Sequence, residues 1–313
     1  DHSDTIVSLL NLADFYESLG RYREAEPFYA RALEILEQQI ESDESEIIYF
    51  YSDVLSRLAG VYKSMRRYEE AETFYLRFLE ISEQLAYGPD DPNIVYSLDD
   101  LAGLYQAMGR YDEAETLYQR ALAINEHAHG DDPDSTVYSL NNLAWLNQTM
   151  GRYDEAESFY RRALEIRKEQ LGSNHIHVAN SFSDLASLYQ SAGRYDEAES
   201  RYRQALALRE QELGSDHPRV ADSLNNLAWL HQLRGRYDKA EPLYRQTLEI
   251  REQALGFNHR RTAASLDNLA YLYWLMGRYD EAEPFYMQAL ESFEQAVGPD
   301  HPETGASLNN LAL

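Results

Sequence analysis

Amide, carboxylate and aromatic side chains recur together at fixed spacing along the chain. One set comprises Tyr138, Asn142 and Trp145, and the same register further along the chain holds Asn226 and Trp229. An amide both donates and accepts hydrogen bonds, so it can pair with a peptide unit whatever side chains that unit carries. Tryptophan and tyrosine are enriched among the residues that dominate binding energy at protein interfaces. The chemistry that these residues predict is non-covalent recognition of a polypeptide.

A histidine recurs in the same connecting segment of successive repeats, at His175, His217, His259 and His301, with His177 beside the first. Metal ligands must converge on one ion, whereas these residues are each a full repeat apart. We therefore predict that the histidines cap helices or bond neighbouring loops, and that the chain binds no metal and no cofactor. The aspartate pairs at 90–91 and 131–132 are expected to be caps too, because the alternating ligands of an EF-hand are missing around them.

The sequence gives no better support for a catalytic site than for a metal site. Acid pairs such as Glu155 and Glu157 recur along the array, whereas an active site would be a singular feature. The chain has no cysteine, no glycine-rich phosphate loop and no Gly-x-Ser-x-Gly. We predict that it is not an enzyme.

The net charge of the chain limits the classes of partner that it is expected to bind. It has 313 residues, with 54 acidic and 28 basic side chains and a formal net charge of −26. Such a surface repels phosphate backbones and anionic lipid, so we expect no nucleic acid and no membrane, and a protein segment instead. The absence of cysteine excludes disulfides and fits a reducing, cytoplasmic compartment. No apolar run approaches the roughly 18 residues that a membrane span requires.

Internal repeats determine the elements that position these side chains. The string Gly-Arg-Tyr-Asp-Glu-Ala-Glu recurs, with variants, at Gly20, Arg66, Gly109, Gly151, Gly193, Gly235 and Gly277, and the last five copies are 42 residues apart. The string Ser-Leu-Asn-Asn-Leu-Ala recurs in phase at Ser139, Ser223 and Ser307.

Each period has the pattern of two helices. Pro133 fits the first turn of a helix that Asp132 can cap. Leu140, Leu143 and Ala144 follow at helical spacing, and Gly151 turns the chain into a second helix. One tyrosine column has the spacing of a packed core: Tyr29, Tyr75, Tyr118, Tyr160, Tyr202, Tyr244 and Tyr286. The fold class predicted is all-α, built from antiparallel helix pairs.

The Leu-Ala, Gly-x-Tyr-x-x-Ala and Tyr-x-x-Ala spacings resemble tetratricopeptide repeats. The 42-residue period and Leu-Gly-x-Asp-His-Pro at 213–218 resemble the kinesin light chain type in particular. The resemblance implies one right-handed superhelical solenoid over residues 1–313. Its expected repeats are about 1–42, 43–90, 91–132, 133–174, 175–216, 217–258 and 259–300, with a partial repeat at 301–313.

In that family the first helices line a concave groove, and an asparagine at position 6 binds the backbone of an extended peptide. We number each first helix so that its Leu-Ala pair falls at positions 7 and 8, and we call positions 2, 5, 6, 9 and 12 the groove stripe. The resemblance and the composition of the stripe together predict a peptide-binding site at Arg57, Asp100, Tyr138, Asn142, Trp145, Asp184, Asn226, Trp229, Asn268, Tyr271, Trp274 and Asn310. Asn11 also matches position 6.

Three of these residues depart from the family pattern. Light chains that take acidic cargo segments use basic groove residues, whereas Asp100 and Asp184 occupy position 6 here. We therefore expect the central groove to prefer a basic or neutral segment. The second repeat has Arg57 at position 6, which indicates either an acid-binding end of the groove or an insertion that packs on the solenoid, with Asp43 and Glu46 as a capping box. The alternative for the tryptophans is packing between repeats.

Three functions fit the array: an adaptor for cargo or client proteins, a sensory or oligomerisation module of a larger signalling protein, and a structural spacer. This sequence contains no sustained heptad, so this chain alone supports groove function and not attachment to a motor. The sequence stops inside an apolar first helix at 308–313 with no second helix to cover it, so we also expect a fragment or end-to-end self-association.

Overall fold

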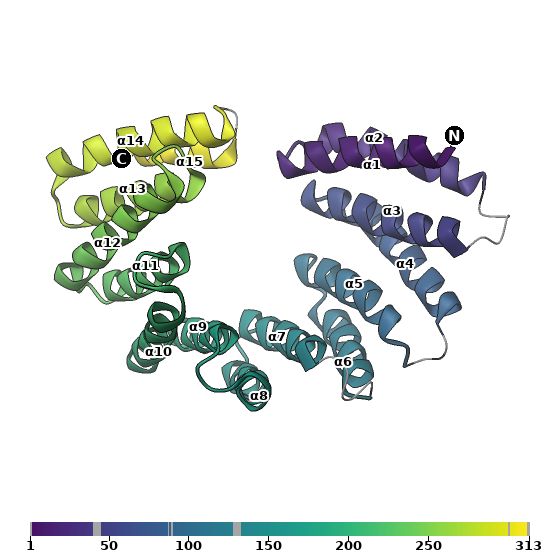
Figure 1. Ribbon diagram of the computed structural model, residues 1–313, viewed down its shortest axis with the longest axis horizontal. Coiled ribbons are helices and arrows are strands. Elements are labelled where there is room, and N and C mark those ends of the chain that lie inside the picture. The colour runs from purple at the N-terminus through teal and green to yellow at the C-terminus, as the bar shows by residue number, and fades with distance from the viewer. Residues whose placement is uncertain are drawn as a thin grey trace. The chain divides into compact units, whose positions relative to one another are not determined.

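The computed structural model describes residues 2–39, 45–86, 88, 90–127, 133–299 and 301–311, and its regular elements there are all helices. The chain forms two compact units, residues 1–152 and 153–313. Within each unit the helices follow one another as packed pairs (Figure 1). The all-α prediction is confirmed. The single solenoid and its repeat boundaries stay a prediction.

The N-terminal unit contains seven of the helices. They are α1 (His2–Ser18), α2 (Tyr22–Glu37), α3 (Ser45–Ser64), α4 (Tyr68–Leu85), α5 (Val95–Ala107), α6 (Tyr111–His127) and α7 (Pro133–Thr149), with the 3-10 turn η2 (Pro92–Ile94) before α5. α1, α3 and α5 each pack on the second helix that follows, and α2, α4 and α6 each pack on the next first helix. Among the described first helices α3 is the longest; Asp43 of the predicted capping box lies outside the described residues.

The C-terminal unit repeats this arrangement. Its helices are α8 (Tyr153–Leu171), α9 (Ile176–Ser191), α10 (Tyr195–Leu213), α11 (Pro218–Leu233), α12 (Tyr237–Leu255), α13 (Arg260–Leu275), α14 (Tyr279–Val297) and α15 (Pro302–Leu311). α9, α11, α13 and α15 are first helices, as are α1, α3, α5 and α7 in the other unit.

Left-handed residues end the first helices. Gly109 has φ = 76°, its N–H donates to the carbonyl of Gln106, and the N–H of Arg110 donates to that of Tyr105. This is the bonding of a Schellman motif, which favours glycine because a Cβ is disfavoured at positive φ. The second repeat has Arg66 at this position, with φ = 60°.

The recurring histidines cap first helices, as the sequence predicts. His217 Nδ1 accepts a hydrogen bond from the N–H of Arg219 at 3.0 Å, and the same bond recurs at His175, His259 and His301. Asp91 caps η2 by accepting from the N–H of Asn93 at 2.9 Å. The predicted cap Asp132 lies outside the described residues. Each acceptor satisfies one of the unpaired N–H groups at a helix start.

The core lies between the helices of each pair and between neighbouring pairs. In the fourth repeat Leu140, Leu143 and Ala144 are fully buried, and the alanine lets neighbouring helices approach closely. The predicted tyrosine column, from Tyr29 to Tyr286, is buried throughout, with no ring more than 6% exposed. These residues are part of the packing framework, as predicted.

From the second repeat onward, an arginine before each second helix contacts a glutamate of the preceding repeat. At Arg194, Nε and Nη2 donate to Glu197 at 2.7 and 2.6 Å, and Nη1 donates to Glu157 of the preceding repeat at 2.5 Å. The guanidinium lies over the ring of Tyr189, 4.3 Å from its centroid. The same contacts recur at Arg110 and Arg278. We call this set the turn arginine framework.

Candidate functional site

The aromatic residues of the groove stripe lie largely at the surface. In the N-terminal unit Tyr96 is 74%, Tyr138 57% and Trp145 54% exposed; in the C-terminal unit Trp229 is 39% exposed. Burial of a large aromatic ring is favourable, so the exposure of rings at positions 2 and 9 of successive first helices is not explained by packing within the repeats. These four side chains are not packed inside the repeats.

The aromatic pair of the seventh repeat differs. The rings of Tyr271 and Trp274 stack on each other, with centroids 5.8 Å apart and planes at 10°. Both side chains are half-buried and pack against the core cluster of α13 and α14. Position 12 holds glutamine in the third to sixth repeats, whereas Trp274 at this position contributes to packing as well as to the surface.

The position 6 amides are half-buried and bond to the preceding repeat. Asn142 Nδ2 donates to Asp99 at 3.3 Å, Asn268 Nδ2 to Asn225 at 3.0 Å, and Asn310 Nδ2 to Asp267 at 2.8 Å. In every case the acceptor is the position 5 side chain of the repeat before. Each bond fixes the orientation of the amide and leaves its carbonyl oxygen and second N–H outside the pair.

The same register has two variants. Asp100 accepts a hydrogen bond from the Ser56 hydroxyl at 2.6 Å. In this pair the position 6 carboxylate is the acceptor and the position 5 hydroxyl is the donor, the reverse of the amide pairs. Ser183 instead donates to the carbonyl of Ala179, at 3.1 Å, and Asn226 of the next repeat has no such bond among the described residues. Sequence reasoning missed this pairing, although the recurrence of polar residues 43 positions apart was its signal.

The carboxylates of the N-terminal unit lie close together under the exposed tyrosines. Burial raises the pKa of Asp99 to about 7 against the hydrogen bond from Asn142, and the charge of Asp100 raises it further. Burial also raises the pKa of Asp100 and lowers that of Lys63, the cation that faces it. Both Asp99 and Asp100 also raise the pKa of Tyr138, whose largest cause is burial.

The C-terminal unit balances its carboxylates with arginines from the second helices. Burial raises the pKa of Asp184 to about 6, although the charges of Arg167 and Arg209 oppose the shift. Arg209 itself is buried, and it donates to Asn180 at position 2 of the stripe at 2.9 Å.

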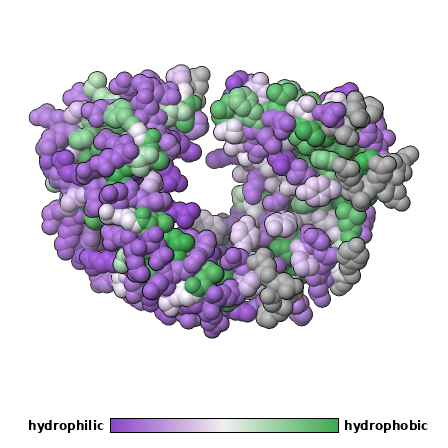
Figure 2. Space-filling view, viewed as in Figure 1, coloured by the Kyte–Doolittle hydropathy of each residue, from purple (hydrophilic) through white to green (hydrophobic). Residues whose placement is uncertain are grey.

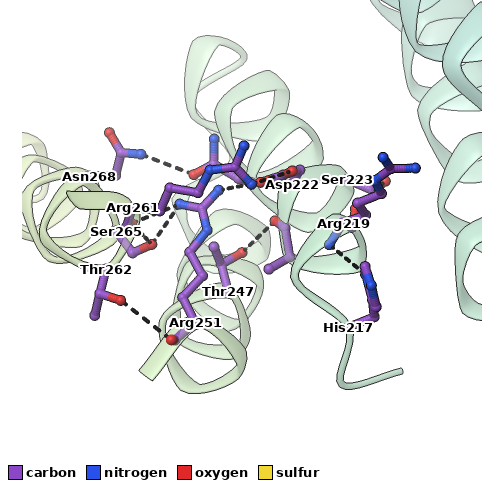
Figure 3. Close-up of polar contacts among 12 residues, drawn as sticks. His217, Arg219, Asp222, Ser223, Thr247, Arg251, Arg261, Thr262, Ser265 and Asn268 are labelled. Carbon is purple, nitrogen blue, oxygen red and sulfur yellow. Dashed lines mark hydrogen bonds and ion pairs between the residues drawn. The ribbon is translucent and has the colours of Figure 1, made fainter. Parts of the chain in front are cut away.

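Arg251 makes the equivalent contacts one repeat later. It donates to Asp222 at 2.7 Å and to Ser265 at 2.8 Å, while Arg261 reaches Asp222 from α13 at 3.3 Å (Figure 3). The sequence analysis did not identify these buried arginines, because they belong to second helices. Their recurrence at 167, 209 and 251 was the available signal.

Arg57 is held within the N-terminal unit. Its Nε donates to Asp53 and its Nη1 to Asp14, both at 2.8 Å. The Tyr29 hydroxyl also donates to Asp14, at 2.5 Å, and to Glu17 at 2.8 Å. These contacts favour the packing interpretation of the second repeat, and a role of Arg57 in binding stays a prediction.

Figure 2 shows hydrophilic residues over most of the visible face, with apolar residues in separate groups. No helix in the described residues has the length and apolar character needed to cross a membrane. Among the same residues, no three His, Asp or Glu side chains group as metal ligands do.

Comparison with known protein families identifies the repeats of this chain. Tetratricopeptide repeat patterns match residues 51–127, 96–169, 135–211, 177–253 and 261–313, and a second such pattern matches residues 8–42. The chain belongs to the tetratricopeptide repeat family. No protein with a curated description matches it.

Solved structures specify the type of repeat. BtubC (BKLC) from P. vanneervenii is 28% identical, with a TM-score of 0.61 over 72% of this chain and 90% of that one. A putative kinesin light chain from Podosopora anserina with nearly identical TPR-like repeats is 28% identical, with a TM-score of 0.54 over 67% and 98% of the two chains. The resemblance to kinesin light chain repeats is confirmed.

A third structure shows the fold alone. The STAND protein with a tetratricopeptide repeat sensor from Pyrococcus horikoshii is 18% identical, with a TM-score of 0.62 over 99% of this chain and 44% of that one. The repeats form a scaffold of the kind that mediates protein–protein interaction.

Proposed function

We propose that this protein is a non-catalytic adaptor whose first helices bind an extended segment of another protein, as a kinesin-light-chain-like cargo adaptor does. The observation that carries the proposal is the exposure of Tyr138 at position 2 and of Trp145 and Trp229 at position 9 of first helices, beside half-buried position 6 amides. Exposed aromatic anchors supply apolar contact area, and the amides supply hydrogen bonds to a backbone.

The bonds between repeats support this role for the amides. Because Asn142 and Asn268 are each held by one N–H, a ligand meets a donor and an acceptor that are already oriented. Pre-oriented groups lose less conformational entropy on binding. Removing one such amide is expected to weaken binding by about 1–3 kcal/mol when its peptide partner is left unsatisfied.

The charge distribution supports a basic or neutral segment, most strongly in the N-terminal unit. Among the described residues Lys63 is the cation whose charge acts on Asp100, and no cation acts in this way on Asp99, next to two exposed tyrosines. A lysine or arginine of the partner can pair with the carboxylates and lie over an aromatic ring. In the C-terminal unit the arginines already balance the carboxylates, so the preference is expected to be weaker.

The test is a binding titration with matched lysine-rich, glutamate-rich and neutral peptide pools. The wild-type protein is expected to bind the lysine-rich pool most tightly. Trp145→Ala and Trp229→Ala should each weaken binding by about 2 kcal/mol, or more than tenfold, because each removes an aromatic anchor. Met287→Ala is the matched control, since it removes an exposed apolar side chain from the second helix α14.

Two outcomes would count against the proposal. Tighter binding of the glutamate-rich pool would remove the charge argument. Equal effects of Met287→Ala and Trp145→Ala would mean that binding does not use the first helices, and no binding of any pool at any salt concentration would favour a structural spacer.

A further inference from the structure

The turn between α11 and α12 departs from the turn arginine framework. Arg236 occupies the framework position, and its Nη1 atom donates to Glu199 of the preceding repeat at 3.3 Å. Three residues later the chain has Lys239 in place of the glutamate that pairs with Arg110, Arg194 and Arg278. In the described part of the chain Glu199 is the only hydrogen-bond partner of Arg236, so its Nε and Nη2 donors face no carboxylate.

Two further substitutions add to this difference. Arg234 stands where the second, third, fourth and seventh repeats have methionine, and it pairs with Asp196 at 2.7 Å and with Glu199 at 3.2 Å. His231 stands where five other repeats have the tyrosine that lies under the framework arginine. Arg236 therefore lacks both the carboxylate and the aromatic ring that hold its counterparts.

The result is a local excess of positive charge. Arg203 pairs with Glu199 at 2.6 Å, so four cations (Arg203, Arg234, Arg236 and Lys239) stand against Glu199 and Asp196. The junctions before and after balance two arginines with two glutamates. The excess sets this junction apart from its two neighbours, in a chain whose net charge is −26.

The side chains border an open surface cavity of about 480 Å³ that is lined by Asp196, Glu199, Ser200, Arg203 and Arg236. His231 lies below it, 3% exposed, with Nε2 4.0 Å from Glu199 and with Nδ1 lacking a hydrogen-bond partner in the described structure. Burial lowers the pKa of His231 against the charge of Glu199, and the surrounding cations lower it further. Because the imidazole of His231 is neutral, only the arginines and the lysine carry the excess positive charge.

We propose that this cavity, the Arg236 site, binds a phosphate group. The planar fork of an arginine pairs bidentately with carboxylate or phosphate, and the framework arginines show the carboxylate case within this chain. A phosphate monoester carries about −1.5 to −2 charge at pH 7, which matches two surplus cations, whereas a carboxylate balances one. The site lies on α10 and the turn before α12, apart from the groove stripe. Its phosphate can be inorganic or carried by a phosphorylated residue of a partner.

The experiment is calorimetric titration of the full chain at constant ionic strength. The three probes are inorganic phosphate, N-acetyl-phosphoserine N-methylamide and N-acetyl-glutamate N-methylamide. Lys239→Glu restores the residue of the other repeats, so the variant should fold, pair with Arg236 and lower phosphate affinity by about tenfold or more. Arg234→Met should lower it severalfold. Lys168→Glu, the same charge change on α8, should change it by less than about twofold.

The results distinguish free phosphate from a phosphorylated partner, and they also test the proposal itself. Equal binding of inorganic phosphate and the phosphoserine probe supports a site for free phosphate, and tighter binding of the phosphoserine probe supports a phosphorylated partner. The proposal is overturned if neither phosphate probe binds saturably at millimolar concentration, if Lys239→Glu binds as the wild type does, or if the glutamate probe binds as tightly as phosphoserine. Circular dichroism of each variant confirms that a lost site is not a lost fold.

Discussion

At the scale of single residues, the carboxylate of Asp99 combines a structural and a recognition role. It accepts the hydrogen bond that orients Asn142, yet its burial raises its pKa to about 7. Since the pKa in the folded state exceeds the ordinary value of 3.8, the stability that this group contributes is present below pH 3.8 and is lost as the pH rises through 7.

The variant Asp99→Asn tests this linkage. An asparagine at this position would form the pair that Asn225 and Asn268 already form in the C-terminal unit. The variant should gain stability relative to the wild type as the pH rises from about 4 to 8, because the neutral amide does not have to ionise. Denaturant unfolding across this range measures it, with the exposed Asp112→Asn as control. Parallel curves for wild type and Asp99→Asn would contradict the assignment.

Arg66 is a second residue at which the backbone conformation lowers the stability of the fold. It adopts φ = 60° where the equivalent turns have glycine, and a Cβ is strained there by about 1–2 kcal/mol. Arg66→Gly should raise the free energy of unfolding by up to about 1 kcal/mol, since the more flexible unfolded chain offsets part of the gain.

The reverse change is the control for Arg66. Gly109 has φ = 76°, and a Cβ added there meets no atom within 4 Å. The effect of Gly109→Ala therefore comes from the backbone alone. It should destabilise by about 1 kcal/mol. A loss of stability in Arg66→Gly would show that the arginine side chain contributes more than its backbone costs.

At the scale of the helices, local chemistry determines where each element begins and ends. His217 caps α11 through its Nδ1 atom, and His217→Ala should cost about 1 kcal/mol by leaving a helix N–H unpaired. His217→Asn keeps a capping oxygen and should retain most of that stability. Thermal and urea unfolding of the two variants measure the difference; equal losses would show that the ring acts by packing.

The sequence predicts features that depend on neighbours along one helix or turn. The glycine turns, the histidine caps and the buried tyrosine column follow from residue type at fixed spacing, and the structure confirms them. The bond from Asn142 to Asp99 and the reach of Arg251 to Asp222 depend on how one repeat stacks on another. The pattern of a single helix does not contain that distance, so these contacts could not be predicted. The stacking of Trp274 on Tyr271 joins residues three apart on α13, so helical spacing alone was enough to predict it, and the sequence analysis missed it.

At the scale of the whole chain, net charge determines how a partner approaches. A charge of −26 attracts basic segments over several ångströms, and salt screens that attraction. Affinity for a lysine-rich peptide should fall steadily as ionic strength rises from about 0.05 to 0.5 M, while affinity for a neutral peptide changes little. Titrations at several salt concentrations measure the slopes. Equal slopes would mean that the carboxylates do not face the ligand.

The most direct test of the proposed function uses the tryptophans themselves. The chain has three, Trp145, Trp229 and Trp274, and all belong to the groove stripe. Titration with a lysine-rich peptide should change their fluorescence saturably, with smaller changes in Trp145→Phe and Trp229→Phe and weaker binding in an Asn142→Ala, Asn226→Ala double variant. A peptide that binds, by calorimetry, without any change in tryptophan fluorescence would contradict recognition by the first helices.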